Sequence, residues 1–389
     1  MSAKSFQPLH HLVNFIFLAS GVFVLSTASP LYAQGSGKRA YGLPFILSSP
    51  SAVAYGMGGG LVSAGTEASA IIYNPAALTR TGRLALEGNT FKLLPQLFDD
   101  VRFSHIAGAF QIPSTDRLWL GAAYTYVNLG EITVDAGGPT PLAVFKTYER
   151  AFSVAAATKF GQHLRLGMSF KYLRSELAPQ LSNTAEREDA TASAFVIDFG
   201  ALYDGFLPQA HFSRQFLSKP LFWQKWAHKG LAPGFSFGVT LANLELKSKL
   251  GGEAFDNLLP HMLRLGLTWN IFASDVIGVM ITGERATIYL EPFQSSTDPV
   301  FRTLFPNRTN NATFNNVGCE INLFYLAAFR FGFPGNNADG SDYSSRSGVS
   351  IGPPGLRFSY GEDNTGFLNL FGAEPTKVYS LSLVLDKLP

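Results

Sequence analysis

The sequence predicts an all-β protein, a transmembrane antiparallel β-barrel, and three observations carry this prediction. Apolar and polar residues alternate with a period of two over much of residues 83–389. Charged residues make up 15% of the 389 residues, against roughly 25% in soluble domains, while aromatic residues reach 13%. No apolar run after residue 33 has the length of a membrane-spanning helix. A wall of lipid-facing strands accounts for the low charge and the high aromatic content together.

The first 33 residues have the pattern of an export signal. Lys4 precedes an apolar stretch over residues 12–25, and small residues follow it, so that cleavage after Ala33 or Ala28 fits the rule for signal peptidase. The alternative is an anchor that stays attached. An exported chain with lipid-facing strands belongs in the outer membrane of a Gram-negative-type bacterium. The only cysteine, Cys319, excludes an internal disulfide and a cysteine-based metal cluster.

The alternation assigns each strand an outer and an inner face. Within residues 262–271 we expect Leu265 and Leu267 to face lipid, and Gly266 and Thr268 to face the lumen. Twelve strands are clear, and the longest of them is residues 317–333. The other eleven are residues 83–92, 101–112, 117–128, 148–160, 163–173, 192–204, 234–244, 262–271, 275–288, 354–361 and 377–386. Two short apolar pieces, residues 41–47 and 348–352, bring the expected number to about fourteen.

The connections between these strands divide into two classes by length. Residues 113–116, 161–162 and 272–275 form tight turns, whereas residues 129–147, 175–191 and 289–313 form long connections. The tight turns fall on one side of the sheet and these long connections on the other. Outer-membrane barrels have short periplasmic turns and long external loops, so both chain ends are expected in the periplasm. The rival fold, a soluble β-sandwich, would carry many more charged residues on its polar strand faces.

The segment ahead of the strands, residues 52–78, lacks alternation and is rich in small residues. Gly56, Gly58, Gly59 and Gly60 fall within five positions, which allows a compact path in a narrow space. Asn74-Pro75 predicts a turn, since proline fixes its own φ and restricts the residue before it.

Two motifs in this segment resemble the opening signature of a known family. Gly56-Met57-Gly58-Gly59 and, after a small-residue stretch, Tyr73-Asn74-Pro75-Ala76-Ala77-Leu78 are similar to the PorV/PorQ family of the FadL-type outer-membrane superfamily. The resemblance implies a 14-stranded barrel with an N-terminal plug in its lumen. The family-signature plug residues would then be Gly56, Met57, Gly58, Gly59, Asn74, Pro75 and Ala76. The implied organisation is a signal peptide at residues 1–33, a plug segment at 34–82 and the barrel at 83–389.

The C-terminal strand, residues 377–383, is also similar to the family's closing strand. The chain then ends with Leu388-Pro389, without the terminal aromatic residue that many outer-membrane barrels use as an assembly signal.

The sequence offers no set of residues for catalysis, and we expect no enzyme activity. The seven histidines are scattered and form no cluster with serine and aspartate. No metal, cofactor or phosphate motif is evident, and a net charge of +2 gives no indication of nucleic-acid binding. An insertion over residues 206–230 combines basic residues with Phe and Trp. It fits an interfacial anchor or a docking surface on the periplasmic side, or else an ordinary long connection.

Two functions are compatible with the resemblance. PorV-like proteins are implied to be accessory or shuttle components of type IX protein secretion, with secreted proteins and the translocon as partners of the external loops. FadL-like proteins are implied to transport hydrophobic small molecules, such as fatty acids or aromatic hydrocarbons. Outer-membrane lipid is a partner in both cases.

Overall fold

The computed structural model describes residues 44–93, 100–134, 143–178, 190–218, 231–250, 259–289, 311–336, 345–353, 355–363 and 375–385. The expected signal peptide lies outside these residues. So do parts of the long connections, residues 219–230 of the 206–230 insertion and residues 386–389.

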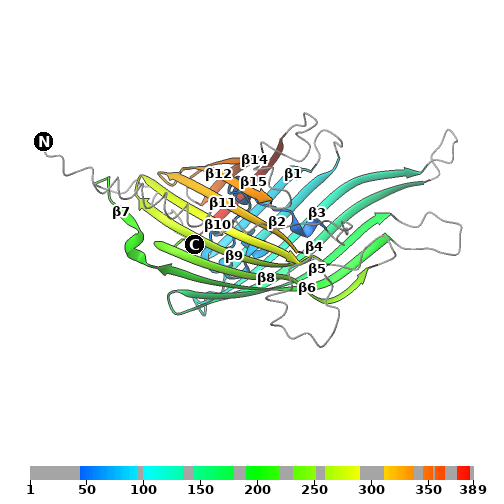
Figure 1. The fold of residues 1–389 in the computed structure, drawn as a ribbon, viewed down its shortest axis with the longest axis horizontal. Helices are drawn as coiled ribbons and strands as arrows, with labels where there is room; N and C mark the ends of the chain where they lie inside the picture. The colour runs from blue at the N-terminus through cyan, green and yellow to red at the C-terminus, as the bar shows by residue number, and fades with distance from the viewer. Residues whose placement is uncertain are drawn as a thin grey trace.

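Fourteen antiparallel strands form a closed barrel, which confirms the predicted fold class. They are β1 (Leu84–Lys92), β2 (Arg102–Gln111), β3 (Leu118–Val134), β4 (Ala143–Phe160), β5 (Leu164–Ala178), β6 (Ala190–Phe206), β8 (Gly234–Leu250), β9 (His261–Ser274), β10 (Ile277–Tyr289), β11 (Asn311–Leu323), β12 (Ala327–Asn336), β13 (Arg346–Ile351), β14 (Leu356–Asp363) and β15 (Thr376–Leu385). The ring closes where β1 pairs with β15, Leu84 opposite Leu385. A short fifteenth strand, β7 (Phe212–Arg214), runs parallel to the end of β9 (Figure 1).

The expected strand at 317–333 is two strands, and this prediction was wrong. Phe324 and Tyr325 both have positive φ, 52° and 60°, which turns the chain between β11 and β12. In this hairpin Ile321 pairs with Phe329, so odd-numbered residues of both strands share the outer face. The alternation therefore continues through the turn, and periodicity alone does not reveal it.

The two short apolar pieces have different structures. Residues 348–352 lie largely within β13, as expected. In the other piece, residues 44–47 form a 3₁₀ helix, η2, rather than a strand. The twelve strands that are clear in the sequence become fourteen in the structure, because residues 317–333 contribute to two strands, β11 and β12, and because β13 is added.

The inner and outer faces lie as the alternation predicts. Leu265 is 37% exposed on the outside, whereas Thr268 is 1% exposed and its hydroxyl contacts the hydroxyl of Ser63 in the lumen. Phe329, Phe331 and other large apolar side chains are likewise exposed on the outer wall. An apolar outer face of this kind is what a lipid-facing wall requires.

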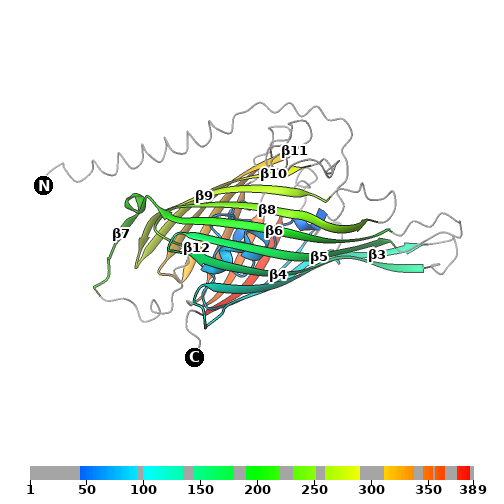
Figure 2. The same ribbon diagram turned by 90° about the horizontal axis from the view of Figure 1, so that it is seen from below.

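The lumen is filled by the segment that precedes β1, drawn in blue in Figures 1 and 2. Its elements are η2 (Pro44–Leu47), α2 (Ala52–Gly56), α3 (Ala70–Tyr73) and η3 (Pro75–Arg80). Almost all residues between 50 and 81 are buried. None of the helices in the described part of the chain is long and apolar enough to cross a membrane. We refer to residues 44–81 as the plug.

Candidate functional site

The first signature motif ends helix α2 in a left-handed glycine turn. The hydroxyl of Ser51 caps the helix by accepting the N–H of Val53 at 3.2 Å. Gly58 and Gly59 then have φ of 70° and 93°, a conformation that residues with a Cβ adopt at a cost. Met57, between helix and turn, is fully buried. The motif thus fixes a tight reversal of the chain inside the barrel.

This reversal packs against bare backbone on the barrel wall. Four wall glycines, the first glycine patch, come from β11 to β14: Gly318, Gly332, Gly348 and Gly361. A Cβ on Gly318 would lie 2.6 Å from the carbonyl oxygen of Met57, and one on Gly361 would lie 2.7 Å from that of Ala52. A Cβ on Gly332 would overlap the amide of Gly58. Any side chain at these positions would force the plug away from the wall.

The second signature motif is a capped turn that holds several carbonyl groups. The side-chain oxygen of Asn74 accepts the N–H of Ala76 at 3.1 Å, and Pro75 starts η3 at a position where no N–H is needed. The amide nitrogen of Asn74 faces the carbonyl oxygens of Val62 and Ala201 at 3.0 and 3.2 Å. Asn74 therefore joins two parts of the plug to β6.

This second motif also lies on wall glycines. The second glycine patch comes from β5, β6, β8 and β9 and consists of Gly167, Gly200, Gly238 and Gly266. A Cβ on Gly167 or Gly200 would overlap the backbone of Pro75 and Ala76 or the side chain of Asn74. At Gly238 it would lie 2.6 Å from the carbonyl oxygen of Val62. Each signature motif thus has its own patch, and the two patches lie on different arcs of the wall.

A buried ion cluster fixes the end of the plug. Arg80, the last residue of η3, pairs with Asp204 of β6, and Arg165 of β5 pairs with the same carboxylate. Arg80 also donates to the carbonyl oxygen of Ser63 at 2.8 Å, and Arg165 donates to that of Thr79 at 3.2 Å. Charge-assisted hydrogen bonds of this kind are among the strongest polar contacts in proteins.

The middle of the plug is held by polar groups on β9, β10 and β1. The N–H of Val62 donates to the Glu284 carboxylate at 3.1 Å. The hydroxyl of Ser63 lies 2.7 Å from that of Thr268. The N–H of Ser69 donates to Glu87 of β1 at 2.8 Å. The plug is therefore hydrogen-bonded to the wall on several sides.

Glu67 is the ionisable group of the plug with the most perturbed environment. Burial raises its pKa from the ordinary 4.5 to about 8, and the nearby carboxylate of Glu87 acts in the same direction. Arg330 and Arg357 on the wall oppose this shift. The hydroxyl of Ser51 donates to the Glu67 carboxyl at 3.2 Å. A carboxyl group in this setting favours its neutral form near pH 7.

The wall of β1 to β6 changes character along the barrel axis. Beside the plug, on the periplasmic half, small alanines pack against Ile71 and Leu78 of the plug. Toward the external end, the inward residues are larger, and Phe91, Phe103 and Leu173 belong to an apolar cluster there. The plug thus packs against mainly small wall residues around Ile71 and Leu78 and against larger ones around Phe45 and Ala52.

The anchoring residues Arg80, Arg165 and Asp204 were missed from the sequence. They are separated by up to 124 positions, and only the barrel register brings them together. One available signal was the inward position of Asp204 and Arg165, because a charged residue facing a barrel lumen needs a partner there.

The described part of the 206–230 insertion covers the periplasmic end of β9. The indole of Trp269 donates to the carbonyl oxygen of Ala210 at 3.0 Å, and the N–H groups of Phe216 and Leu217 donate to Asp275. The chain here is fastened to the barrel rim, and Phe216 remains 50% exposed. Whether this segment is an interfacial anchor stays a prediction.

A closed strand ring with an apolar exterior and a filled lumen defines a plugged outer-membrane β-barrel. The family model "Type IX secretion system protein PorV" matches residues 34–216. Over these residues the match confirms the resemblance seen in the signature motifs, and the chain is a barrel of the outer membrane. A search of curated proteins found no match to the sequence.

Three of the solved structures that match this chain are described as toluene transporters or a monoaromatic hydrocarbon channel. The Ralstonia pickettii toluene transporter TbuX is 13% identical with a TM-score of 0.48, covering 86% of this chain and 98% of TbuX. The Pseudomonas putida toluene transporter TodX is 11% identical with a TM-score of 0.47, covering 90% of this chain and 100% of TodX. The CymD monoaromatic hydrocarbon channel is 13% identical with a TM-score of 0.48, covering 90% of this chain and 100% of CymD.

Proposed function

We propose that this barrel is an outer-membrane accessory of type IX protein secretion that receives secreted proteins on its external loops. The match of residues 34–216 to the PorV family carries the proposal. That family is described as a type IX secretion system protein. Secreted proteins and a translocon are the partners that we propose.

The arrangement of the plug supports a role outside the lumen. Two glycine patches, the Asp204 ion cluster and Glu284 hold the plug against several strands. A segment held by so many contacts would have to lose all of them before a folded protein could pass. We therefore assign binding to the external connections, and we propose residues 34–82 as one plug unit that follows a cleaved signal at 1–33.

The strands extend further than the sequence predicts, so the connections expected at 129–147 and 175–191 are shorter. An epitope inserted at residues 135–142, between β3 and β4, or at residues 179–189, between β5 and β6, tests the proposal. We expect reduced co-purification of secreted proteins while the barrel still inserts, as judged by antibody binding to whole cells. The matched control places the same epitope in the periplasmic turn at 113–116, where capture should persist. A pull-down of the unmodified barrel that yields lipid ligands and no secreted protein would contradict the shuttle function. So would a genome without type IX C-terminal sorting domains.

A second candidate, transport of hydrophobic small molecules, has one observation in its favour. The inward residues Phe91, Phe103, Val127 and Leu173 give the lumen an apolar lining on the β1 to β5 side, which packs in part with Phe45 and Ala52 of the plug. Such a lining suits a fatty acid or an aromatic hydrocarbon. Saturable binding of a long-chain fatty acid to the purified barrel, abolished by Phe103→Asp, would support transport. Tight capture of secreted proteins without fatty-acid binding would support the shuttle.

A further inference from the structure

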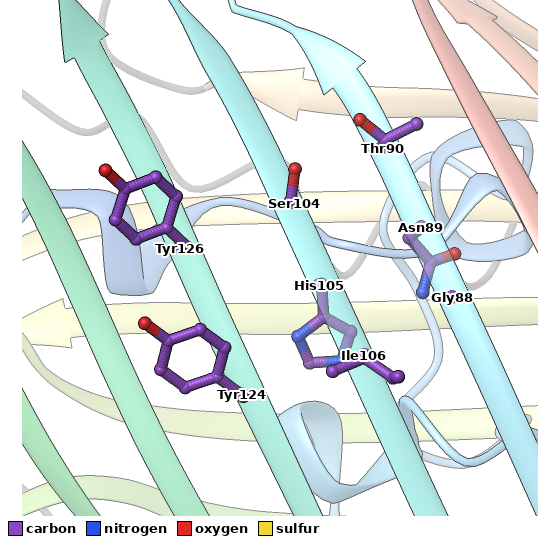
Figure 3. A pocket seen from close by; sticks show the side chains of 8 residues that line it. All are labelled: Gly88, Asn89, Thr90, Ser104, His105, Ile106, Tyr124 and Tyr126. Atoms are coloured by element: carbon purple, nitrogen blue, oxygen red, sulfur yellow. The ribbon is translucent and has the colours of Figure 1, made fainter.

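A groove runs over the outer face of β1, β2 and β3. It encloses ≈ 350 Å³, and its outward-facing lining residues are Gly88, Thr90, Ser104, Ile106, Tyr124 and Tyr126 (Figure 3). The groove exists because Gly88 has no side chain, and a Cβ placed there would meet no atom within 4 Å. Ile106 beside it is 61% exposed. Because this wall faces lipid, the occupant of the groove must come from the membrane.

Basic residues lie directly beyond the external end of this groove. The basic crest consists of four outward-facing side chains, Lys92, Arg102, Arg150 and Arg174, on β1, β2, β4 and β5. Lys92 is opposite Arg102 in the register, and Arg150 is opposite Arg174. Glu176 is the ion-pair partner of Arg174. The crest thus gathers four cationic side chains on four strands of one wall.

Aromatic rings join the groove to the crest. Tyr126, which lines the groove, stacks on Tyr148 with ring centroids 5.9 Å apart. The Arg150 guanidinium lies 5.6 Å from the centroid of Tyr148, within cation–π distance. Tyrosines beside cations mark the depth at which the hydrocarbon meets the headgroups. Below this level the surface accepts an acyl chain, and above it an anion.

The two basic pairs are spaced for more than one anionic group. Lys92 and Arg102 are on adjacent strands, as are Arg150 and Arg174, while β3 separates the two pairs. Neighbouring strands are about 4.8 Å apart, so Arg102 and Arg150 lie roughly 10 Å apart across the sheet. A headgroup with two separated phosphates can contact both pairs, whereas a single phosphate reaches one.

We propose that this surface binds a bis-phosphorylated glycolipid of the external leaflet, with its phosphates on the basic crest and an acyl chain in the Gly88 groove. The crest is at the end of the barrel that carries the long connections, and these are external in barrels of this class. The site lies on the outer wall and does not depend on what the loops capture.

The test is native mass spectrometry of the purified barrel titrated with bis-phosphorylated lipid A, dephosphorylated lipid A and phosphatidylglycerol. Arg102→Gln combined with Arg150→Gln should weaken binding of bis-phosphorylated lipid A by about tenfold or more, since each removes a phosphate-facing cation. It should leave dephosphorylated lipid A unchanged. Gly88→Leu, which fills the groove, should weaken both forms of lipid A.

Matched controls separate these effects from loss of folding. Arg117→Gln removes a cation at the periplasmic end, and Ala156→Leu enlarges an outward residue away from the groove; both should bind like the wild type. Heat-modifiable migration on gels verifies that each variant is folded. Unchanged lipid A binding in folded Arg102→Gln/Arg150→Gln would overturn the proposal. Equally tight binding of phosphatidylglycerol would also overturn it, because a single phosphate would then suffice.

Discussion

Arg80 at the end of the plug and Asp204 of β6 form an ion pair whose side chains are 0% and 1% exposed. Asp204 also holds Arg165 of the neighbouring strand, so one carboxylate balances two guanidinium groups. Both arginines in addition donate to backbone carbonyl groups of the plug. The carboxylate is therefore the central element of the cluster, and its removal leaves two buried cations facing each other.

We expect Asp204→Asn to destabilise the barrel by about 3–5 kcal/mol, because breaking a buried pair leaves uncompensated charge. The loosened plug should also raise single-channel conductance in planar bilayers. Urea unfolding in detergent measures the first effect.

The matched control is the exposed pair of Lys146 and Glu131, whose side chains are 82% and 51% exposed. Lys146→Gln should cost less than about 1 kcal/mol. Equal effects of the two substitutions would show that the Asp204 cluster does not hold the plug.

The glycine patches predict a contrast between two alanine substitutions. Gly332→Ala places a methyl group on the amide of Gly58 and should cost roughly 1–3 kcal/mol through overpacking. Gly88→Ala, on the outer wall with open space around it, should be nearly neutral. Thermal unfolding compares them, and a neutral Gly332→Ala would mean that the plug does not rest on this wall.

Glu67 predicts a pH dependence of plug docking. Its pKa in the folded protein, about 8, is above the ordinary 4.5, so the folded state binds the extra proton. This contribution to stability is complete below pH 4.5 and is lost as the pH rises to about 8. Glu67→Gln keeps an acceptor for Ser51 and cannot ionise.

The variant should therefore gain stability relative to the wild type as the pH rises from 4.5 to 8, with no further gain above that range. Unfolding midpoints of both proteins across this range measure the difference. A difference that does not change with pH would contradict the assignment.

The lipid-facing stripe predicts a dependence on depth. Leu267→Arg, near the middle of β9, should cost roughly 2–4 kcal/mol in a reversible unfolding assay. Ile351→Arg, at the periplasmic end of β13 and 56% exposed, should cost about 1 kcal/mol or less. The reverse order would mean that this stripe does not face lipid.

Thr268 serves as a test of the inner face. Its hydroxyl contacts Ser63 and Thr282 at 2.7 and 2.9 Å, so Thr268→Arg is expected to disturb the plug through crowding. Raised conductance in this variant, but not in Leu267→Arg, would distinguish the two faces.

Most of the strand architecture could be predicted from the sequence, because alternation is local and a lipid-facing wall enforces it. The prediction of a single strand at 317–333 failed for a physical reason. The turn at Phe324 and Tyr325 keeps odd-numbered residues on the outer face of both strands, and no glycine or proline lies in it. The small-residue segment could be predicted to fill a narrow space. The wall residues that this segment contacts could not be predicted. The contacts of Asn74 and Arg80 with β6 depend on the register of strands far away in the chain.

The closure of the ring by β1 and β15 has a consequence for assembly in the membrane. The plug is joined directly to β1, and β1 completes the wall by pairing with β15, the last strand in the described part of the chain. Once that seam has formed, residues 44–81 could enter only by threading through an end of the finished barrel. The seam is therefore expected to form around a plug already in place, so that the N-terminal segment acts as a template against which the wall is completed.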